Sequence, residues 1–210
     1  DYFTSLEEGE KIAFGKNFIF VISRHCNTSY FPRARKLAAI NDIKRAAEKY
    51  KLSVIVKRHP KERNDGTFEE VFGKDGHGVS WAYSNVHPFL LGKKCIFAVS
   101  FWSGVPVDMI RLGVPSIERF DLRGLPACDT ETALRDETGD PVYEYRYHRL
   151  VLGASDTEKF MSHVEKVMTQ RADVVEQLQA AYRECFPVVD NVNKAIVQEI
   201  ANALDEQNIG

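Results

Sequence analysis

The chain has 210 residues, 44% of them hydrophobic and 28% charged, so it can bury a globular core as one large domain or two small ones. Its net charge of −2 argues against a general nucleic-acid-binding protein. Four separated cysteines without a C-x-x-C pair favour free thiols in a reducing compartment. No apolar run approaches the roughly 20 residues that span a bilayer, and no signal peptide opens the chain, so we expect a cytoplasmic protein.

The first half of the chain alternates apolar runs with helical patterns. A buried strand is expected over 17–23, followed by an amphipathic helix over 34–50, where Ala, Leu and Ile recur at helical spacing. A second strand is expected over 53–58. A polar loop over 64–66 then leads to a weak helix and to a third strand over 78–83.

The same alternation continues toward the middle of the chain. We expect a short helix over 88–92, a strand over 95–100, a helix over 106–112 that stops at Gly113, and a fifth strand over 114–118. Strands and helices at this interval indicate βαβ units. The predicted fold class is therefore α/β, with a Rossmann-like, doubly wound, mostly parallel sheet.

The last third departs from this pattern. Residues 120–149 are rich in Asp, Arg, Gly, Pro and Tyr and predict an irregular excursion over the binding face. Within it, alternation over 143–148 favours an edge strand, with an acceptor groove as the weaker reading. From residue 156 the chain reads as helical, broken near Phe186. The expected parts are a linker or N-terminal extension over 1–16, a nucleotide-binding domain over 17–155, and a helical tail over 156–210 that packs on the same domain.

A cluster of basic side chains follows the second expected strand, in the run Lys57-Arg58-His59-Pro60. Ligands of open α/β sheets bind beyond the carboxyl ends of the strands, where such side chains suit a phosphate. Pro60 biases His59 away from helix, so the imidazole can reach over the sheet edge to a phosphate and stabilise a leaving nucleotide. The alternative is a surface histidine that merely ends the strand. Because side chains alternate, only one of Lys57 and Arg58 can join His59, and we favour Lys57.

A second polar turn, Ser100-Phe101-Trp102-Ser103-Gly104, follows the fourth expected strand. Ser103 is a favoured helix N-cap, and free amides at a helix start attract phosphate. Gly104 would let a ligand approach the backbone closely. The alternative is an ordinary cap that only stabilises the helix. Asp108 fits a solvated helix position as well as a ligand contact.

Two further strand ends carry candidate residues. The run Ser23–His25 ends the first strand, and Arg24 could contact a phosphate or an acidic sugar, or be a surface cation. Glu118 ends the fifth strand, where it could accept from ribose hydroxyls or form a salt bridge with Arg119 or Arg123. The sequence contains no P-loop, no dinucleotide fingerprint and no histidine cluster at metal-ligand spacing.

These motifs resemble the C-terminal half of GT-B glycosyltransferases of the bacterial capsule and lipopolysaccharide type: Kdo transferases, polysialyltransferases and CDP-glycerol glycerophosphotransferases. The similarity covers about residues 17–119. In this chain, His59-Pro60 resembles the HP motif of those enzymes, and residues 100–104 resemble their serine motif. Asp108 and Gly113 continue the serine pattern. The relatives have two adjacent serines, whereas Phe101-Trp102 separates the two serines here. The strand ends and this resemblance together give the predicted nucleotide- and phosphate-binding residues: His59, Pro60, Lys57, Ser103, Gly104, Ser100, Arg24, Ser23 and Glu118.

The resemblance also implies a function. It implies a glycosyltransferase donor domain that binds CMP- or CDP-activated Kdo or sialic acid for transfer to a growing cell-surface polysaccharide. The nucleotide sugar would be a substrate, with no cofactor and no metal. The implied partners are a saccharide acceptor and an N-terminal acceptor domain, and peripheral association with the inner face of the membrane stays open. Since the chain opens at Asp1, we expect it to be part of a longer enzyme.

Two alternatives remain open. One is a non-catalytic docking domain of a polysaccharide-synthesis assembly, which the altered serine motif supports. The other is a sugar-nucleotide epimerase or phosphotransferase on the same fold, because fold does not fix function. An epimerase needs carboxylates in its cleft, and Glu118 is the candidate that the sequence offers.

Overall fold

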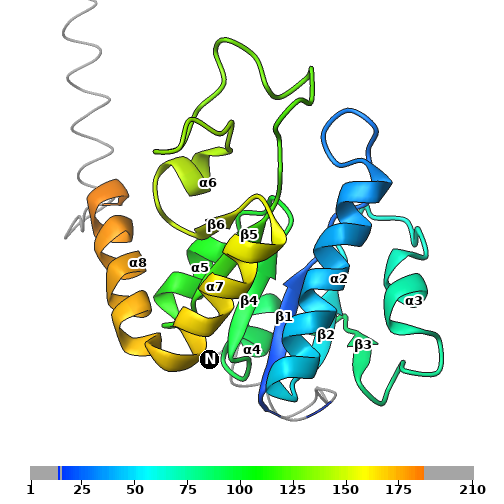
Figure 1. The fold of residues 1–210 in the computed structure, drawn as a ribbon. Coiled ribbons are helices and arrows are strands. Elements are labelled where there is room, and N and C mark those ends of the chain that lie inside the picture. Colours follow the sequence, from blue (N-terminus) through cyan, green and yellow to red (C-terminus); the bar gives the residue numbers. More distant parts are fainter. Residues whose placement is uncertain (1–13, 15, 187–210) are drawn as a thin grey trace, which may run out of the picture.

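A parallel sheet lies at the centre of the protein, for which a computed structural model describes residue 14 and residues 16–186. In that part of the chain, six parallel strands pair in the order β3-β2-β1-β4-β5-β6 (Figure 1). Parallel pairing brings all carboxyl ends to one edge, and the order turns back between β1 and β4, where open sheets bind ligands. The predicted fold class is confirmed. The strands are β1 (Phe18–Ile22), β2 (Ser53–Lys57), β3 (Trp81–Tyr83), β4 (Phe97–Ser100), β5 (Ser116–Arg119) and β6 (Leu152–Ala154).

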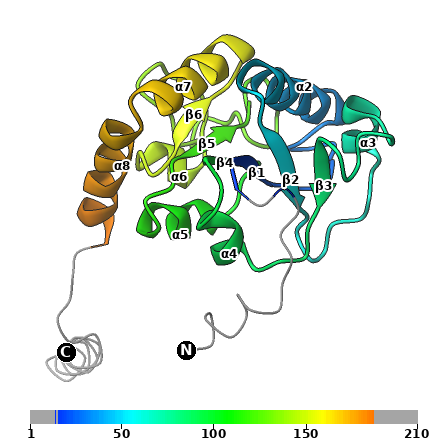
Figure 2. The same ribbon diagram turned by 90° about the horizontal axis from the view of Figure 1, so that it is seen from below.

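Helices cover both faces of this sheet. Seen from below, α2, α3 and α7 lie on one side of the strands and α4 and α5 on the other, with α8 beside α5 (Figure 2). A sheet buried on both faces needs strands that are apolar throughout, which explains the continuous apolar runs. The helices are α2 (Arg33–Tyr50), α3 (Thr67–Phe72), α4 (Pro88–Gly92), α5 (Val105–Arg111), α6 (Glu144–Tyr147), α7 (Thr157–Thr169) and α8 (Arg171–Cys185).

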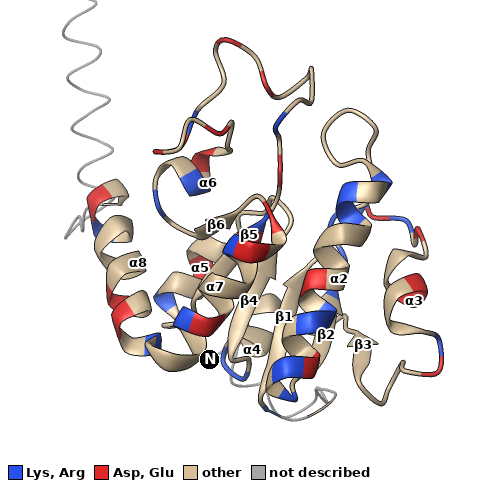
Figure 3. Cartoon of the chain, viewed as in Figure 1, with Lys and Arg blue, Asp and Glu red and all other residues tan. Residues whose placement is uncertain are grey.

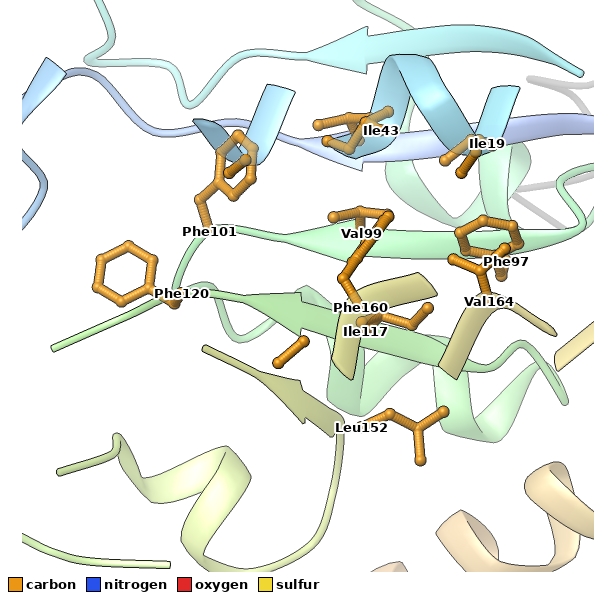
Figure 4. Close-up of a cluster of buried hydrophobic side chains, with 14 of the residues drawn as sticks. Ile19, Ile43, Phe97, Val99, Phe101, Ile117, Phe120, Leu152, Phe160 and Val164 are labelled. Atoms are coloured by element: carbon orange, nitrogen blue, oxygen red, sulfur yellow. The ribbon is translucent and has the colours of Figure 1, made fainter. Parts of the chain in front are cut away.

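The larger core fills the space between the sheet and the helices α2 and α7. Phe160 and Val164 of α7 lie over β4 and β5, and Ile43 of α2 lies toward β1 (Figure 4). Burying a side chain of this size contributes about 1.5–3 kcal/mol. A smaller cluster fills the opposite face, and its members include Phe18, Phe20, Ile55, Leu91 and Met109.

Charged residues gather on helices and loops, whereas β1 and β4 carry none (Figure 3). Arg119 instead lies in a strand, at the end of β5, and its side chain is buried. Its Nε donates to Asp42 Oδ2 of α2 at 2.8 Å, and its Nη1 donates to the carbonyl of Ser155 at 2.7 Å. This one guanidinium therefore joins α2, β5 and the segment after β6. Nothing in the sequence pattern indicated this contact.

Most predicted elements are confirmed in type, with two corrections near the end of the sheet. The strand β6 was not predicted, because three residues are too few to show a periodic pattern. The edge strand expected over 143–148 is wrong, since α6 forms one helical turn there. The side chain of Arg146 in α6 is buried and donates to Ser155 Oγ at 2.8 Å, which fixes that turn against the sheet edge.

The remaining expectations concern the ends of the chain. Within the segment expected to form a helical tail, α7 and α8 are helical, α8 ends at Cys185, and α7 packs on β5 and β6. The linker over 1–16 and the tail over 187–210 lie almost wholly outside the described residues. No helix of the described part is both long and apolar enough to cross a membrane.

Candidate functional site

The loops that follow β1 and β4 meet at the point where the strand order reverses. Arg24, two residues after β1, donates from Nε to the carbonyl of Trp102 at 3.0 Å. Its guanidinium carbon lies 5.1 Å from the centroid of the Trp102 ring, within the range of a cation–π contact. Arg24 and the loop that carries Ser103 are therefore brought together, as the parallel sheet predicts.

His59 lies in the next loop, after β2, and a tight turn fixes it. The N–H of Lys61 donates to His59 Nδ1 at 3.2 Å, and the N–H of His59 donates to Glu62 Oε2 at 3.1 Å. Because Nδ1 accepts, the neutral ring carries its proton on Nε2. Burial lowers the pKa of His59, and the positive charges of Arg24 and Lys61 lower it further against the opposing effect of Glu62. Near neutral pH, His59 is therefore an uncharged Nε2–H donor.

A buried ionic network underlies both of these loops. Lys36 of α2 is fully buried, and its Nζ donates to Glu62 Oε1 at 3.1 Å and to Asp65 Oδ2 at 2.8 Å. Ser23 Oγ also donates to Glu62 Oε1 at 2.8 Å, and the backbone N–H of Cys26 donates to Asp65 Oδ2 at 3.1 Å. Glu62 and Asp65 thus hold the loop after β1 to the loop after β2. Ser23, a predicted ligand contact, is buried in this network.

The two serines of the turn after β4 have different surroundings. Ser100 is fully buried, and among the described residues its hydroxyl has no hydrogen-bond partner. Ser103 is partly exposed, and its Oγ accepts from the N–H of Val105 at 3.3 Å. The capping role considered from the sequence is not confirmed, because Gly104 is the N-cap of α5 and the helix has no side-chain cap. The contact belongs to the turn before the helix, and it leaves the hydroxyl proton of Ser103 free to donate. A Cβ on Gly104 would lie 3.1 Å from the Tyr145 hydroxyl, so the excursion approaches this loop closely.

Trp102 between these serines adopts a backbone conformation that is uncommon outside glycine, with φ of 58°. Its ring stacks on Tyr143 with centroids 4.3 Å apart and an interplanar angle of 11°, and Tyr30 meets it edge-on at 5.4 Å. Residues held in such conformations cluster at functional sites. The stacking with Tyr143 places part of the excursion over 120–149 against the loop after β4. Sequence reasoning missed Trp102, although its insertion between the serines was the signal.

Glu118 is buried at the carboxyl end of β5. Burial raises the pKa of its carboxyl group to about 7, although the charge of Arg146 acts in the opposite direction. The salt bridge considered as its alternative role is not formed among the described residues, because Arg119 and Arg123 each pair with an aspartate. A buried carboxyl group with such a pKa can donate or accept a proton near neutral pH.

The other residues of the basic run point elsewhere. Lys57 Nζ donates to the carbonyl of Asn85 at 3.0 Å, in the loop after β3. The guanidinium carbon of Arg58 lies 4.5 Å from the centroid of the Tyr83 ring, also beside β3. Both side chains therefore lie toward β3, whereas the charge of Arg24 acts on His59. No group of three or more His, Cys, Asp and Glu side chains that could hold a metal ion occurs in the described part of the chain.

Sequence comparisons and structural comparisons give different results. No protein-family model matches the chain, and no curated protein matches its sequence. Similar solved structures include the UDP-GlcNAc 2-epimerase from Neisseria meningitidis bound to UDP-GlcNAc, with a TM-score of 0.57 and 16% identity over 96% of this chain and 49% of that one. UDP-N-acetylglucosamine 2-epimerase from Rickettsia bellii has a TM-score of 0.53 and 17% identity over 90% of this chain and 46% of that one.

A third similar structure is a variant of the wall teichoic acid polymerase TagF. It has a TM-score of 0.54 and 14% identity over 100% of this chain and 49% of that one. The chain thus spans about half the length of each of these structures. At such low identity, the likeness concerns the fold. The sheet order, the flanking helices and these comparisons together show that the chain has the Rossmann-like fold of one half of a GT-B protein.

Proposed function

We propose that this chain is the nucleotide-sugar-binding half of a GT-B glycosyltransferase. The observation that carries the proposal is that Arg24 contacts the Ser103 loop where the order of strands reverses, and that the adjoining loop after β2, which carries His59, is hydrogen-bonded to the loop after β1. Open α/β sheets bind nucleotides at this position. The similar structures support a sugar nucleotide as ligand, because one is described as bound to UDP-GlcNAc and another as a polymerase of wall teichoic acid.

Each of these groups has a defined role in the proposed site. Arg24 supplies a permanent positive charge, and the Nε2–H of His59 and the hydroxyl of Ser103 supply hydrogen bonds to the same phosphate. Negative charge grows on the phosphate of the nucleotide as the sugar departs. Fixed donors stabilise that charge without reorganisation, which lowers the barrier to transfer. The general base and the saccharide acceptor belong to the other half of the enzyme in this proposal.

The donor proposed here is a CMP- or CDP-activated sugar of the Kdo or sialic acid type. Its support is the pairing of His59-Pro60 after β2 with the serine turn after β4, the two motifs that resemble those of capsule and lipopolysaccharide enzymes. The sugar nucleotide acts as substrate, and the proposed reaction invokes no cofactor. In this proposal the transferred sugar extends a cell-surface polysaccharide that is assembled at the inner face of the membrane.

A sugar-nucleotide epimerase is the second candidate function. One specific observation favours it, the buried carboxyl group of Glu118 at the end of β5, whose pKa is about 7. Epimerisation needs a group that moves a proton at carbon, and such a carboxyl group can do so. The two UDP-GlcNAc 2-epimerases among the similar structures support the same candidate.

Calorimetric titration of the chain with CMP, CDP and UDP tests these proposals. A cytidine nucleotide should bind, and His59→Ala should weaken it roughly 10- to 100-fold, since a hydrogen bond to a charged group contributes about 1.5–3 kcal/mol. His148→Ala, at an exposed histidine after α6, is the matched control and should leave affinity unchanged. Preference for UDP would favour the epimerase. Binding of none of the nucleotides by the folded chain would contradict both functions and favour a docking domain.

A further inference from the structure

A small cavity adjoins the site just described. It has a volume of about 290 Å³ and is lined by His25, Cys26, Lys61, Arg63 and Asp65. Its walls come from the loops after β1 and β2, the same loops that carry Arg24 and His59. Three of its five lining residues are basic, and the proposed function uses none of those three.

Asp65, the acidic residue in the cavity wall, already accepts hydrogen bonds from neighbouring side chains. Asp65 Oδ2 accepts from Lys36 Nζ at 2.8 Å, and Asp65 Oδ1 accepts from the hydroxyl of Thr67 at 2.6 Å. Burial opposes ionisation, but the hydrogen bonds from Lys36, Thr67 and Cys26 outweigh it and hold the pKa of Asp65 well below its ordinary value. Asp65 therefore stays ionised, and it shares the buried ammonium of Lys36 with Glu62. Lys61 and Arg63 then add two positive charges to this network of one cation and two anions. Positive charge is in excess at the cavity.

The basic side chains of the cavity lack partners in the described part of the chain. Neither Lys61 Nζ nor the guanidinium of Arg63 forms a hydrogen bond or an ion pair there. His25 Nδ1 is buried and has no hydrogen-bond partner among the same residues. Buried polar atoms without partners are uncommon in native proteins and indicate a missing ligand group or water.

We propose that this cavity is a second anion-binding subsite, which holds a further phosphate or a carboxylate of the ligand whose first phosphate lies at Arg24 and His59. The inference rests on the proposed function and assigns residues of this chain to the second anionic group of its donor. The guanidinium of Arg63 can bind either group in bidentate fashion, with Lys61 and His25 as additional donors. The ligand is thus a nucleoside diphosphate compound, or a nucleoside monophosphate ester of an acidic sugar.

The test compares ligands with one and with two anionic groups on the full chain. CMP, CDP and CMP-N-acetylneuraminate are titrated by calorimetry into the wild type and into the double variant Lys61→Ala, Arg63→Ala. We expect CMP affinity to change by less than about 2-fold and the affinity of a doubly anionic ligand to fall by at least about 10-fold. A loss for CDP identifies a phosphate as the second group, and a loss for CMP-N-acetylneuraminate identifies a carboxylate.

The control double variant Arg45→Ala, Lys49→Ala removes the same charge from exposed positions of α2. The end of this helix lies near the start of β2, away from the loops that follow the strands (Figure 1). It should leave all three affinities unchanged. If the cavity variant weakens CMP as much as the other two ligands, or weakens none of them, the subsite is refuted while nucleotide binding stands. If the wild type binds none of the three ligands, the proposed function itself fails and the subsite fails with it.

Discussion

Lys36→Met should destabilise the protein far more than the loss of an ordinary lysine. The ammonium of Lys36 is fully buried and lies between two carboxylates, at 3.1 Å from Glu62 and 2.8 Å from Asp65. Glu62 is itself 2% exposed, so without Lys36 it remains as a charge that water cannot reach. Removing one partner of a buried ion pair costs about 3–5 kcal/mol. Urea denaturation followed by circular dichroism measures this loss of unfolding free energy.

The same helix provides the matched control. Lys49 of α2 pairs with Glu165 at 3.4 Å, but both side chains are exposed, and Lys49→Met should cost less than about 1 kcal/mol. Glu62→Gln should cost less in the Lys36→Met background than in the wild type, because it then removes an unpaired charge. A loss below about 1 kcal/mol for Lys36→Met would refute the reasoning, since the carboxylates would then have found water or protons.

Two other substitutions test the region around β6 and β5. A Cβ on Gly153 would overlap the side chain of Arg146, so Gly153→Ala should cost about 1–3 kcal/mol in urea denaturation, and an unchanged midpoint would contradict the packing of α6. Glu118 has a folded-state pKa of about 7, raised by burial. The pKa of this carboxyl group in the unfolded chain is about 4.3, so the wild type loses unfolding free energy as the pH rises from about 4.3 to about 7. A glutamine at this position does not titrate and causes no such loss. The difference in unfolding free energy between Glu118→Gln and the wild type should therefore be more favourable to the variant at about pH 8 than at about pH 5. An equal difference at both pH values would contradict the raised pKa.

Strands buried on both faces were the elements most readily predicted from the sequence. The run that became β1 is apolar throughout, and the three central residues of β2 are apolar and buried, as expected of strands that helices cover on both sides. Gly113 also marked the end of α5, and its φ of 68° shows why glycine stands there. The strand β6 left no such signal, because its existence depends on pairing with β5 rather than on its own three residues.

The candidate site was predictable only where a side chain follows a strand end directly. Arg24, His59 and Ser103 fall in this class, and their association followed from parallel topology. Lys36 does not, because a lysine in an amphipathic helix reads as exposed until Glu62 and Asp65 fold over it. The same limit applies to Trp102, whose partner Tyr143 lies in a segment without any periodic pattern. These contacts join residues that are far apart in the sequence, so a local sequence pattern does not predict them.

The position of Trp102 has a practical consequence for spectroscopy. The chain has two tryptophans, and Trp81 is fully buried with its indole N–H donated to the carbonyl of Gly73 at 3.0 Å. Trp102 is partly exposed between Arg24 and Tyr143. Collisional quenchers in solution should therefore reach the emission of Trp102 and spare that of Trp81. One fluorophore thus senses the loop after β4, and the other provides an internal reference for the intact core.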